Sequence, residues 1–370
     1  MRKFVLATVS AVVLALGVVA TGAAAATVVP VTSGLDSPRG LAFLPNGTLA
    51  VAEAGHGGDV CLPEAPCLGL SSQISTIDVA AGTHAPLVSG LISGLDPEGG
   101  SLGVDGLSSQ GGRLIALVGA NPAGLDQASC AGMPSDCGAV VAAAKAQLGQ
   151  LLQVSASGSW RAIAGVGTFD LDYTAANPGG DVFGQEIDSN PYGVLALPGG
   201  TFVADAGSNT LDWVGNNGGI SIVNRFPVPN PPEPFPSDAV PTCVAQGAGG
   251  LTVGDLAGRI WQQHAGTWQL VSPQVGMQHF TGCAADSAGN VYLVSMFSGL
   301  FPGPDVAFTG SVVKLAANGS ISTVAAGLMF PNGIAVGPDG GLYVSTGSIC
   351  PATPGGFCGP FTGGVTKITQ

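Results

Sequence analysis

The sequence predicts an all-β chain folded as a six-bladed β-propeller. Near the C-terminus, Phe330–Ser345 places two short apolar runs on either side of the turn Pro338-Asp339-Gly340, and this pattern is typical of a β-hairpin. Near-copies occur at Ser37–Val51 and Asn190–Val203. A hairpin that recurs along a chain is a repeat unit. The 60 Gly and 27 Pro residues also fit many short strands joined by tight turns.

The N-terminus has the pattern of a secretory signal peptide. Met1-Arg2-Lys3 precedes the almost wholly apolar run Phe4–Ala20, and small residues follow up to Ala26. We expect cleavage near Ala24 or Ala26, so that residues 1–26 are the signal peptide and 27–370 form a single propeller domain, secreted to the extracellular space or the periplasm. A membrane anchor is the alternative, although the run is short for a span.

The charge of the exported chain excludes two classes of partner. Loss of Arg2 and Lys3 leaves 8 basic against 23 acidic side chains, a net charge of −15. Nucleic acids and anionic membranes both attract basic surfaces. We therefore expect neither as a partner, and we expect a monomer that has no membrane span after cleavage.

The eight cysteines predict disulfides, because an even count in an exported chain favours them. Three pairs are close in sequence and are expected to form local bridges: Cys61–Cys67, Cys130–Cys137 and Cys350–Cys358. The remaining two, Cys243 and Cys283, occupy equivalent positions in neighbouring units to within one residue. Either a bridge between two blades or two buried free thiols fits that spacing. Zinc is disfavoured, since its cysteine ligands usually lie two to four residues apart.

Six units follow one another along the chain, and each is expected to contain strands that run outward from the axis. The first three units are predicted at Leu41–Phe43, Thr48–Glu53, Ser72–Asp78 and His84–Ser89; at Val104–Leu107, Arg113–Val118, Gln150–Val154 and Trp160–Ala164; and at Gly193–Leu197, Thr201–Asp205, Thr210–Val214 and Ile220–Arg225.

The last unit has only three predicted strands. Units four to six are predicted at Cys243–Gln246, Leu251–Asp255, Gly258–His264 and Trp268–Ser272; at Cys283–Asp286, Asn290–Ser295, Ser311–Ala316 and Ile321–Ala325; and at Gly333–Val336, Gly341–Ser345 and Val365–Thr369. Val28–Val31 has no partner of its own and is expected to complete the last blade. Pro30 suits an outermost strand, and this pairing would leave no open edge.

The long loops are predicted to share one face of the propeller. Links between first and second strands, and between third and fourth strands, are short turns. The second-to-third links and the links between units are long, and they contain the three local cysteine pairs. In repeat proteins, a face that collects the insertions is often the binding face.

Several segments resemble the ScyD/ScyE family of exported proteins, which is named from the scytonemin gene cluster of cyanobacteria. The matching segments are Gly34–Phe43, Val51–Gly58, Asp188–Pro198, Val203–Asn209 and Val240–Thr242. The resemblance extends over essentially the whole mature chain and is most specific at Asp188-Ser-Asn-Pro-Tyr-Gly193. It implies a propeller related to NHL and gluconolactonase-like repeats, in a family whose activity is not settled. Leu251–Arg259 departs from the family by lacking a longer aromatic and proline-rich loop.

Candidate site residues lie where the blades converge on the axis at the loop-rich mouth. Four stand just before innermost strands, namely Arg39, Asn190, Tyr192 and Asn332, and acidic residues end second strands, namely Glu53, Asp205 and Asp255. Oxygen ligands from several blades resemble the metal site of gluconolactonase-like propellers. Such a site here would use Glu53, Asn190, Asp205 and Asn332 to hold Ca²⁺, which favours many oxygen ligands. Alternatively, the carboxylates cap loops by accepting backbone N–H bonds.

Two functions remain open from the sequence. The first is a secreted binding protein that holds a small molecule or a protein partner on its loop-rich face. The second is a metal-dependent lactonase-like hydrolase at the channel mouth. We favour the first, because a fold alone carries no chemistry. His56 is the best-placed histidine for acid–base work, but an exposed loop histidine is more often only solvated. The expected ligand is uncharged or cationic and partly apolar, since aromatic residues are predicted on that side: Phe169, Tyr173, Phe183, Tyr192, Phe235, Phe301, Phe357 and Phe361.

Overall fold

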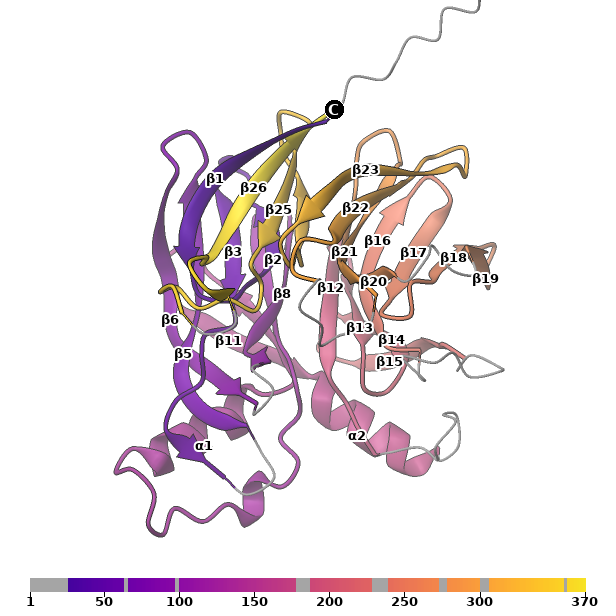
Figure 1. Cartoon of the computed structure of the whole chain (residues 1–370). Coiled ribbons are helices and arrows are strands. Elements are labelled where there is room, and N and C mark those ends of the chain that lie inside the picture. Colours follow the sequence, from indigo (N-terminus) through magenta and orange to yellow (C-terminus); the bar gives the residue numbers. More distant parts are fainter. Residues whose placement is uncertain are drawn as a thin grey trace, which may run out of the picture.

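The strands of this computed structural model form six sheets arranged as the blades of a β-propeller (Figure 1). The structure describes residues 26–62, 66–96, 100–177, 187–227, 239–272, 278–299, 306–355 and 358–370. The predicted fold class is therefore confirmed. The predicted signal peptide lies, except for Ala26, outside the described residues.

The first three blades follow the predicted units, and several of their strands are longer than predicted at one or both ends. Blade one contains β2 (Pro38–Phe43), β3 (Leu49–Glu53), β4 (Val60–Cys61), β5 (Cys67–Asp78), β6 (Thr83–Leu95) and β7 (Ser101–Leu102). Blade two contains β8 (Val104–Gln110), β9 (Arg113–Val118), β10 (Gln150–Val154) and β11 (Trp160–Gly165). Blade three contains β12 (Pro191–Leu197), β13 (Gly200–Asp205), β14 (Thr210–Gly215) and β15 (Ile220–Arg225).

The other three blades repeat this order of strands. Blade four contains β16 (Pro241–Gly247), β17 (Gly250–Asp255), β18 (Ile260–His264) and β19 (Thr267–Ser272). Blade five contains β20 (Gln278–Ala285), β21 (Val291–Ser298), β22 (Gly310–Leu315) and β23 (Ile321–Leu328). Blade six contains β24 (Ile334–Val336), β25 (Leu342–Thr346), β26 (Gly363–Thr369) and, from the other end of the chain, β1 (Thr27–Leu35).

Strand β1 closes the ring as predicted. It pairs antiparallel with β26, in a register that runs from Thr27↔Thr369 to Leu35↔Gly363. The start of β1 is exposed on the outer rim, whereas Leu35 at its end is fully buried. The two ends of the described chain are therefore held together in one sheet, and the last blade has its full set of strands.

Two helices occur where the sequence analysis expected only loops. Helix α1 (Cys137–Gln147) and the short 3₁₀ turn η1 (Leu125–Gln127) lie in the link from β9 to β10, and α2 (Val166–Ala176) lies in the link from β11 to β12. Both α-helices lie at the loop-rich end of the propeller, at the bottom of Figure 1. Among the described residues, no helix is long and apolar enough to cross a membrane.

The core lies mainly between neighbouring blades. Between blades two and three, for example, Ile115 and Leu117 pack in one cluster with Val203 and Val214. Similar clusters of Val, Leu, Ile and Ala fill the other seams. Each blade therefore buries its faces against its neighbours, as a ring of sheets requires.

All eight cysteines are paired. The three predicted local bridges are present. Cys243 on β16 and Cys283 on β20 form the fourth, with their Cα atoms 5.5 Å apart. Of the two alternatives that the sequence left open, the bridge between blades is therefore the one observed.

Candidate functional site

In blades one to five, a break in strand register at the start of the inner strand leaves a residue unpaired at the axis, and in blade six the equivalent residue precedes β24. In blade three, Pro191 pairs with Asp205 and Gly193 pairs with Ala204, so Tyr192 is the extra residue between them. The same break in register leaves Asp105, Thr242 and Thr281 unpaired in blades two, four and five. Bulges commonly re-aim a side chain beside a functional site. We call the six residues at this position the axial ring: Arg39, Asp105, Tyr192, Thr242, Thr281 and Asn332.

The sequence analysis identified three members of the axial ring, namely Arg39, Tyr192 and Asn332. It missed Asp105, Thr242 and Thr281. A local pattern could have found them, because five of the six ring residues are followed by Gly and the sixth, Thr242, by Cys243. The predicted inner strands of blades four and five begin at Cys243 and Cys283, after the ring residues, whereas the observed strands begin earlier, at Pro241 and Gln278, and this hid the repeat.

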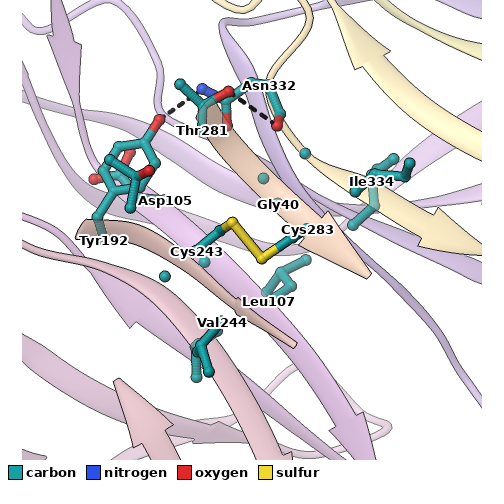
Figure 2. Close-up of a pocket in the computed structure, with 17 residues that line it drawn as sticks. Gly40, Asp105, Leu107, Tyr192, Cys243, Val244, Thr281, Cys283, Asn332 and Ile334 are labelled. Carbon is teal, nitrogen blue, oxygen red and sulfur yellow. Dashed lines mark hydrogen bonds between the residues drawn. A yellow bond between two sulfur atoms is a disulfide. The ribbon is translucent and has the colours of Figure 1, made fainter. Parts of the chain in front are cut away.

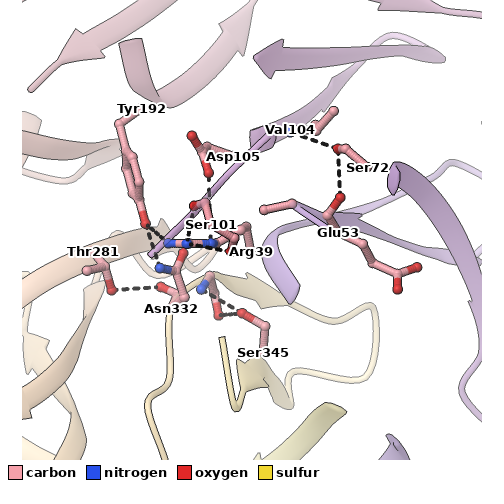
Figure 3. Close-up of polar contacts among 12 residues, drawn as sticks. Arg39, Glu53, Ser72, Ser101, Val104, Asp105, Tyr192, Thr281, Asn332 and Ser345 are labelled. Carbon is pink, nitrogen blue, oxygen red and sulfur yellow. Dashed lines mark hydrogen bonds and ion pairs between the residues drawn. The ribbon is translucent and has the colours of Figure 1, made fainter. Parts of the chain in front are cut away.

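Hydrogen bonds join the ring residues of four blades (Figure 3). The Arg39 guanidinium donates to Tyr192 Oη over 3.0 Å and to the Ser101 carbonyl over 2.9 Å. Asn332 Nδ2 donates to the same Tyr192 Oη over 2.6 Å. Thr281 Oγ1 donates to the Asn332 carbonyl over 3.2 Å. Tyr192 is therefore the common acceptor at the centre of this cluster.

Arg39 and Asp105 are the charged pair of the axial ring. Arg39 Nε lies 3.8 Å from Asp105 Oδ1, and both side chains are buried. Burial raises the pKa of Asp105 to about 6, even though the neighbouring guanidinium favours its charged form. Burial also raises the pKa of Tyr192. At neutral pH the ring therefore contains one cation, one carboxylate and a protonated phenol.

The backbones of neighbouring inner strands approach closely beside the ring, around the pocket drawn in Figure 2. A Cβ on Gly282 would lie 2.2 Å from the Asn332 carbonyl oxygen, and one on Gly193 would lie 2.5 Å from that of Thr242. Only glycine allows neighbouring inner strands to approach so closely. The cavity that is left, lined by ring residues and by the Cys243–Cys283 bridge, has a volume of about 50 Å³. That is room for a few water molecules, at roughly 10–15 Å³ of such space for each.

The predicted acidic residues do not point into the mouth together. Glu53 is buried, and its carboxylate accepts from Asp36 N, Gln73 Nε2 and Ser75 Oγ. Figure 3 shows this carboxylate turned away from the Arg39 cluster. The Glu53 carboxylate thus stabilises the turn that leads into β2.

Asp205 and Asp255 are held in the same way. Asp205 accepts from the backbone N–H groups of Asn190, Gly207 and Ser208. Asp255 accepts from Arg259 and from Trp261 Nε1. This geometry corresponds to the loop-capping alternative.

The four residues proposed for calcium do not fit one shared ion. Asn190 Oδ1 accepts from Ala120 N, while the Asn332 amide donates toward Tyr192. The oxygens of Glu53 and Asp205 have the partners described above, and the Arg39 cation lies among the ring oxygens. Among the described residues, no group of three or more His, Cys, Asp and Glu side chains is arranged to hold a metal ion.

Two further predicted features lie on the loop-rich face. Phe361 is exposed and packs edge-to-face on exposed Phe308, with ring centroids 5.5 Å apart. His56 Nδ1 lies 2.5 Å from Asp36 Oδ2, with most of its ring in solvent. Phe169 and Tyr173 are half-buried on α2. The predicted Phe183, Phe235, Phe301 and Phe357 lie outside the described residues.

Comparison with solved structures identifies relatives in fold. A gluconolactonase from Xanthomonas campestris is 9% identical and superposes with a TM-score of 0.55 over 93% of this chain and 89% of its own. The chain has the fold of the gluconolactonase-like propellers. A luciferin-regenerating enzyme is 11% identical, with a TM-score of 0.51 over 93% of this chain and 95% of its own.

A third similar structure carries a different chemistry. It is the PQQ-bound aldose sugar dehydrogenase from Streptomyces coelicolor, which is 14% identical and has a TM-score of 0.51 over 94% of this chain and 99% of its own. No protein-family model matches the sequence, and no curated protein matches it. Identities this low support the fold alone, so function has to be argued from the site.

Proposed function

We propose that the chain is a secreted propeller of the ScyD/ScyE type that holds a small ligand or a protein partner on its loop-rich face, without a metal ion at the mouth. The observation that carries this proposal is the hydrogen bonding of Tyr192. Its Oη accepts from both Arg39 and Asn332. A phenol has one O–H to donate, and among the described residues Tyr192 Oη takes part in these two bonds as acceptor and in no bond as donor.

The Tyr192 hydroxyl is thus a hydrogen-bond donor that is held in a fixed position and has no acceptor bonded to it among the described residues. Because burial raises its pKa, the phenol keeps its proton at neutral pH. Arg39 and Asn332 hold the oxygen in place, so little entropy is lost when a ligand accepts this bond. The matching group on a ligand is a carbonyl, hydroxyl or ether oxygen.

The charges of the ring favour an uncharged ligand over a metal ion. The Arg39 cation faces the Asp105 carboxylate, so the pair is close to neutral. A divalent cation beside them would be repelled by a guanidinium that cannot lose its proton. The alternative, a lactonase-like hydrolase using Ca²⁺ held by Glu53, Asn190, Asp205 and Asn332, therefore has less support.

The exposed aromatic pair suggests how an apolar part of the ligand is held. Phe308 comes from the link between β21 and β22, and Phe361 from the link between β25 and β26. The Cys350–Cys358 bridge constrains the second of these links. Rings that are fixed in this way offer apolar area at low entropic cost. Four disulfides also suit an oxidising compartment, which supports export.

A thermal-shift screen of small uncharged and cationic aromatic molecules tests the proposal. Compounds that raise the Tm of the wild-type protein are retested on Phe308→Ala, on Phe361→Ala and on Tyr192→Phe. We expect each of these three variants to lose most of the rise in Tm that the compound causes in the wild-type protein. Leu270→Ala is the matched control, because Leu270 is a similarly exposed apolar residue on the outer strand β19.

Two results would count against the proposed site. If a compound raises the Tm of all four variants equally, the ligand binds away from the loop-rich face. A shift that appears only with added Ca²⁺ and disappears with a chelator would favour the metal-dependent alternative.

A further inference from the structure

Two groups of the axial ring lack half of their hydrogen bonding. Tyr192 Oη accepts from Arg39 and Asn332, and its own O–H is bonded to no described acceptor. Asp105 has the opposite deficit, because it is a carboxylate that needs donors and its Oδ1 receives no hydrogen bond from any described group. Both side chains line the cavity drawn in Figure 2. The cavity therefore meets a donor without an acceptor and an acceptor without a donor.

Arg39 offsets the charge of Asp105 without a hydrogen bond to it. Arg39 Nε lies 3.8 Å from Asp105 Oδ1, which is beyond hydrogen-bond length, and Nε has no described acceptor of its own. The other two nitrogens of the guanidinium donate to Tyr192 and to the Ser101 carbonyl. Only 6% of Asp105 is exposed. Buried carboxylates generally accept hydrogen bonds, so this one is matched to a donor that the described part of the chain does not supply.

Packing holds the Asp105 carboxylate in place. A Cβ on Gly119, the residue after β9, would lie 2.0 Å from Asp105 Oδ2, so only glycine leaves room for the carboxylate there. The break in register between Val104 and Gly106 leaves Asp105 unpaired at the axis. Tyr192 Oη is fixed in turn by its two donors. Because both groups are preformed, little rotamer entropy is lost when a ligand bonds to them.

The two deficits define the polar group that completes the ring. An ether, an ester or a tertiary amide only accepts, so it would pair with Tyr192 and leave the buried carboxylate without a donor. An ammonium group only donates, and it would lie beside the Arg39 cation. A hydroxyl, or an amide with an N–H, both accepts and donates. Water does the same, so a ligand group that displaces water here has to reproduce both bonds.

The size and lining of the cavity suit such a group. Its volume is about 50 Å³. At roughly 10–15 Å³ for each water, that is room for a few non-hydrogen atoms, which is the end of a molecule and not a whole ligand. Apolar side chains line the cavity as well, among them Leu107, Val244 and Ile334 (Figure 2). They suit the carbon atoms that carry the polar group.

We propose that the axial ring recognises the hydroxyl or N–H amide end of its ligand. Tyr192 Oη donates to the oxygen of that group, and the group's own O–H or N–H donates to Asp105. This inference rests on the proposed function, because it concerns the same mouth, and it narrows the ligand from any oxygen acceptor to one that also donates. Groups that only accept are rejected by at least about tenfold in affinity, since they leave the buried carboxylate unpaired.

Two pairs of probes test the proposal in ligand-observed NMR titrations of the full protein. Benzyl alcohol is compared with benzyl methyl ether, and benzamide with N,N-dimethylbenzamide, so that methylation removes the donor within each pair. We expect wild type to bind the donor-bearing member at least about tenfold more tightly. In Asp105→Asn, the side chain gains an N–H donor for an ether or carbonyl oxygen, so most of this preference should disappear.

The same variant separates hydrogen bonding from fit. Asn has nearly the size of Asp, so a preference caused by the added methyl groups would persist in Asp105→Asn, and that result would overturn the proposal. Leu270→Ala, on the outer strand β19, is the control and should keep the wild-type preference. Thermal unfolding of each variant checks that it is folded.

The outcomes distinguish this inference from the proposed function. Equal affinities within each pair in wild type would overturn the inference, while weaker binding of all four probes by Tyr192→Phe would still support a ligand at the mouth. Failure of both benzyl alcohol and benzamide to bind would also overturn the inference. Probes that bind Tyr192→Phe and Phe361→Ala as tightly as wild type would overturn both. Binding that requires added Ca²⁺ would overturn both in favour of a metal ion.

Discussion

At the scale of single residues, Arg39 has the largest structural role in the mouth. It comes from blade one, reaches Tyr192 of blade three and the Ser101 carbonyl that precedes blade two, and faces Asp105 of blade two. A buried guanidinium requires such partners, because an isolated charge in the interior is costly. The arginine therefore ties together the inner strands of several blades.

Arg39→Ala should destabilise the protein by about 3–5 kcal/mol, because it leaves the Asp105 carboxylate buried without its cation. Adding Asp105→Asn to that variant should restore part of the loss. Urea denaturation of the two single variants and the double variant measures the coupling. Exposed Arg161→Ala is the control and should change stability by less than about 0.5 kcal/mol. Strict additivity of Arg39→Ala and Asp105→Asn would contradict the pairing.

Asp105 also predicts a pH dependence at acidic pH. Its folded pKa of about 6 lies above the unfolded value of about 3.9, so the native state binds more protons between these values. Its contribution to stability is fully present below about pH 4 and is lost as pH rises to about 6, a change of about 3 kcal/mol. The difference in unfolding free energy between wild type and Asp105→Asn, measured from pH 4 to 7, should show this decline. A constant difference would refute it.

At the scale of elements, the β-bulge that begins the inner strands builds the mouth. It adds one residue ahead of a glycine or cysteine, so the extra side chain faces the axis while the next residue allows close contact between blades. The sequence repeats this pattern, and the hairpins could be predicted from it. The inward direction of the ring residues could not, because a shift of one residue reverses the face of a strand.

The Cys243–Cys283 bridge lies at this same level of the inner strands and joins blades four and five. It closes a span of 40 residues, whereas the local bridges close 6 to 8. On the loop-entropy model, its loss should cost about 4 kcal/mol, against about 2 kcal/mol for each local bridge. Chemical denaturation of Cys243→Ala/Cys283→Ala and of Cys61→Ala/Cys67→Ala compares the two kinds. A larger loss of stability on removing the local pair would show that strand packing, and not the Cys243–Cys283 bridge, holds blades four and five together.

At the scale of the whole molecule, the fold was predictable and the site only in part. The repeated hairpins, the missing outer strand and the paired cysteines are local patterns. They can be recognised in the sequence without knowing how the chain packs. The carboxylates of Glu53 and Asp205 were expected at the mouth, yet Glu53 accepts from Asp36 N and Asp205 from Asn190 N. That choice depends on donors contributed by residues distant in sequence. Helices α1 and α2 were missed because the Gly- and Cys-containing links around them indicated loops.

Similar folds with different chemistries show why the mouth decides the function. A gluconolactonase and a PQQ-bound sugar dehydrogenase superpose on this chain at similar TM-scores. In this chain, the mouth holds a ring of inward-facing side chains in which a guanidinium and a phenol are in contact. Such a ring offers hydrogen bonds to a ligand.

The most direct test is a hydrolysis assay with D-glucono-1,5-lactone as the probe, run on purified protein with added Ca²⁺, Mn²⁺ or Zn²⁺ and again after EDTA. For a binding protein without a metal at its mouth, we expect the rate to equal that of buffer with the same ions under every condition. Hydrolysis that requires the ion, stops with EDTA and is lost in Asn332→Ala would contradict that assignment and identify the mouth as a metal-dependent active site.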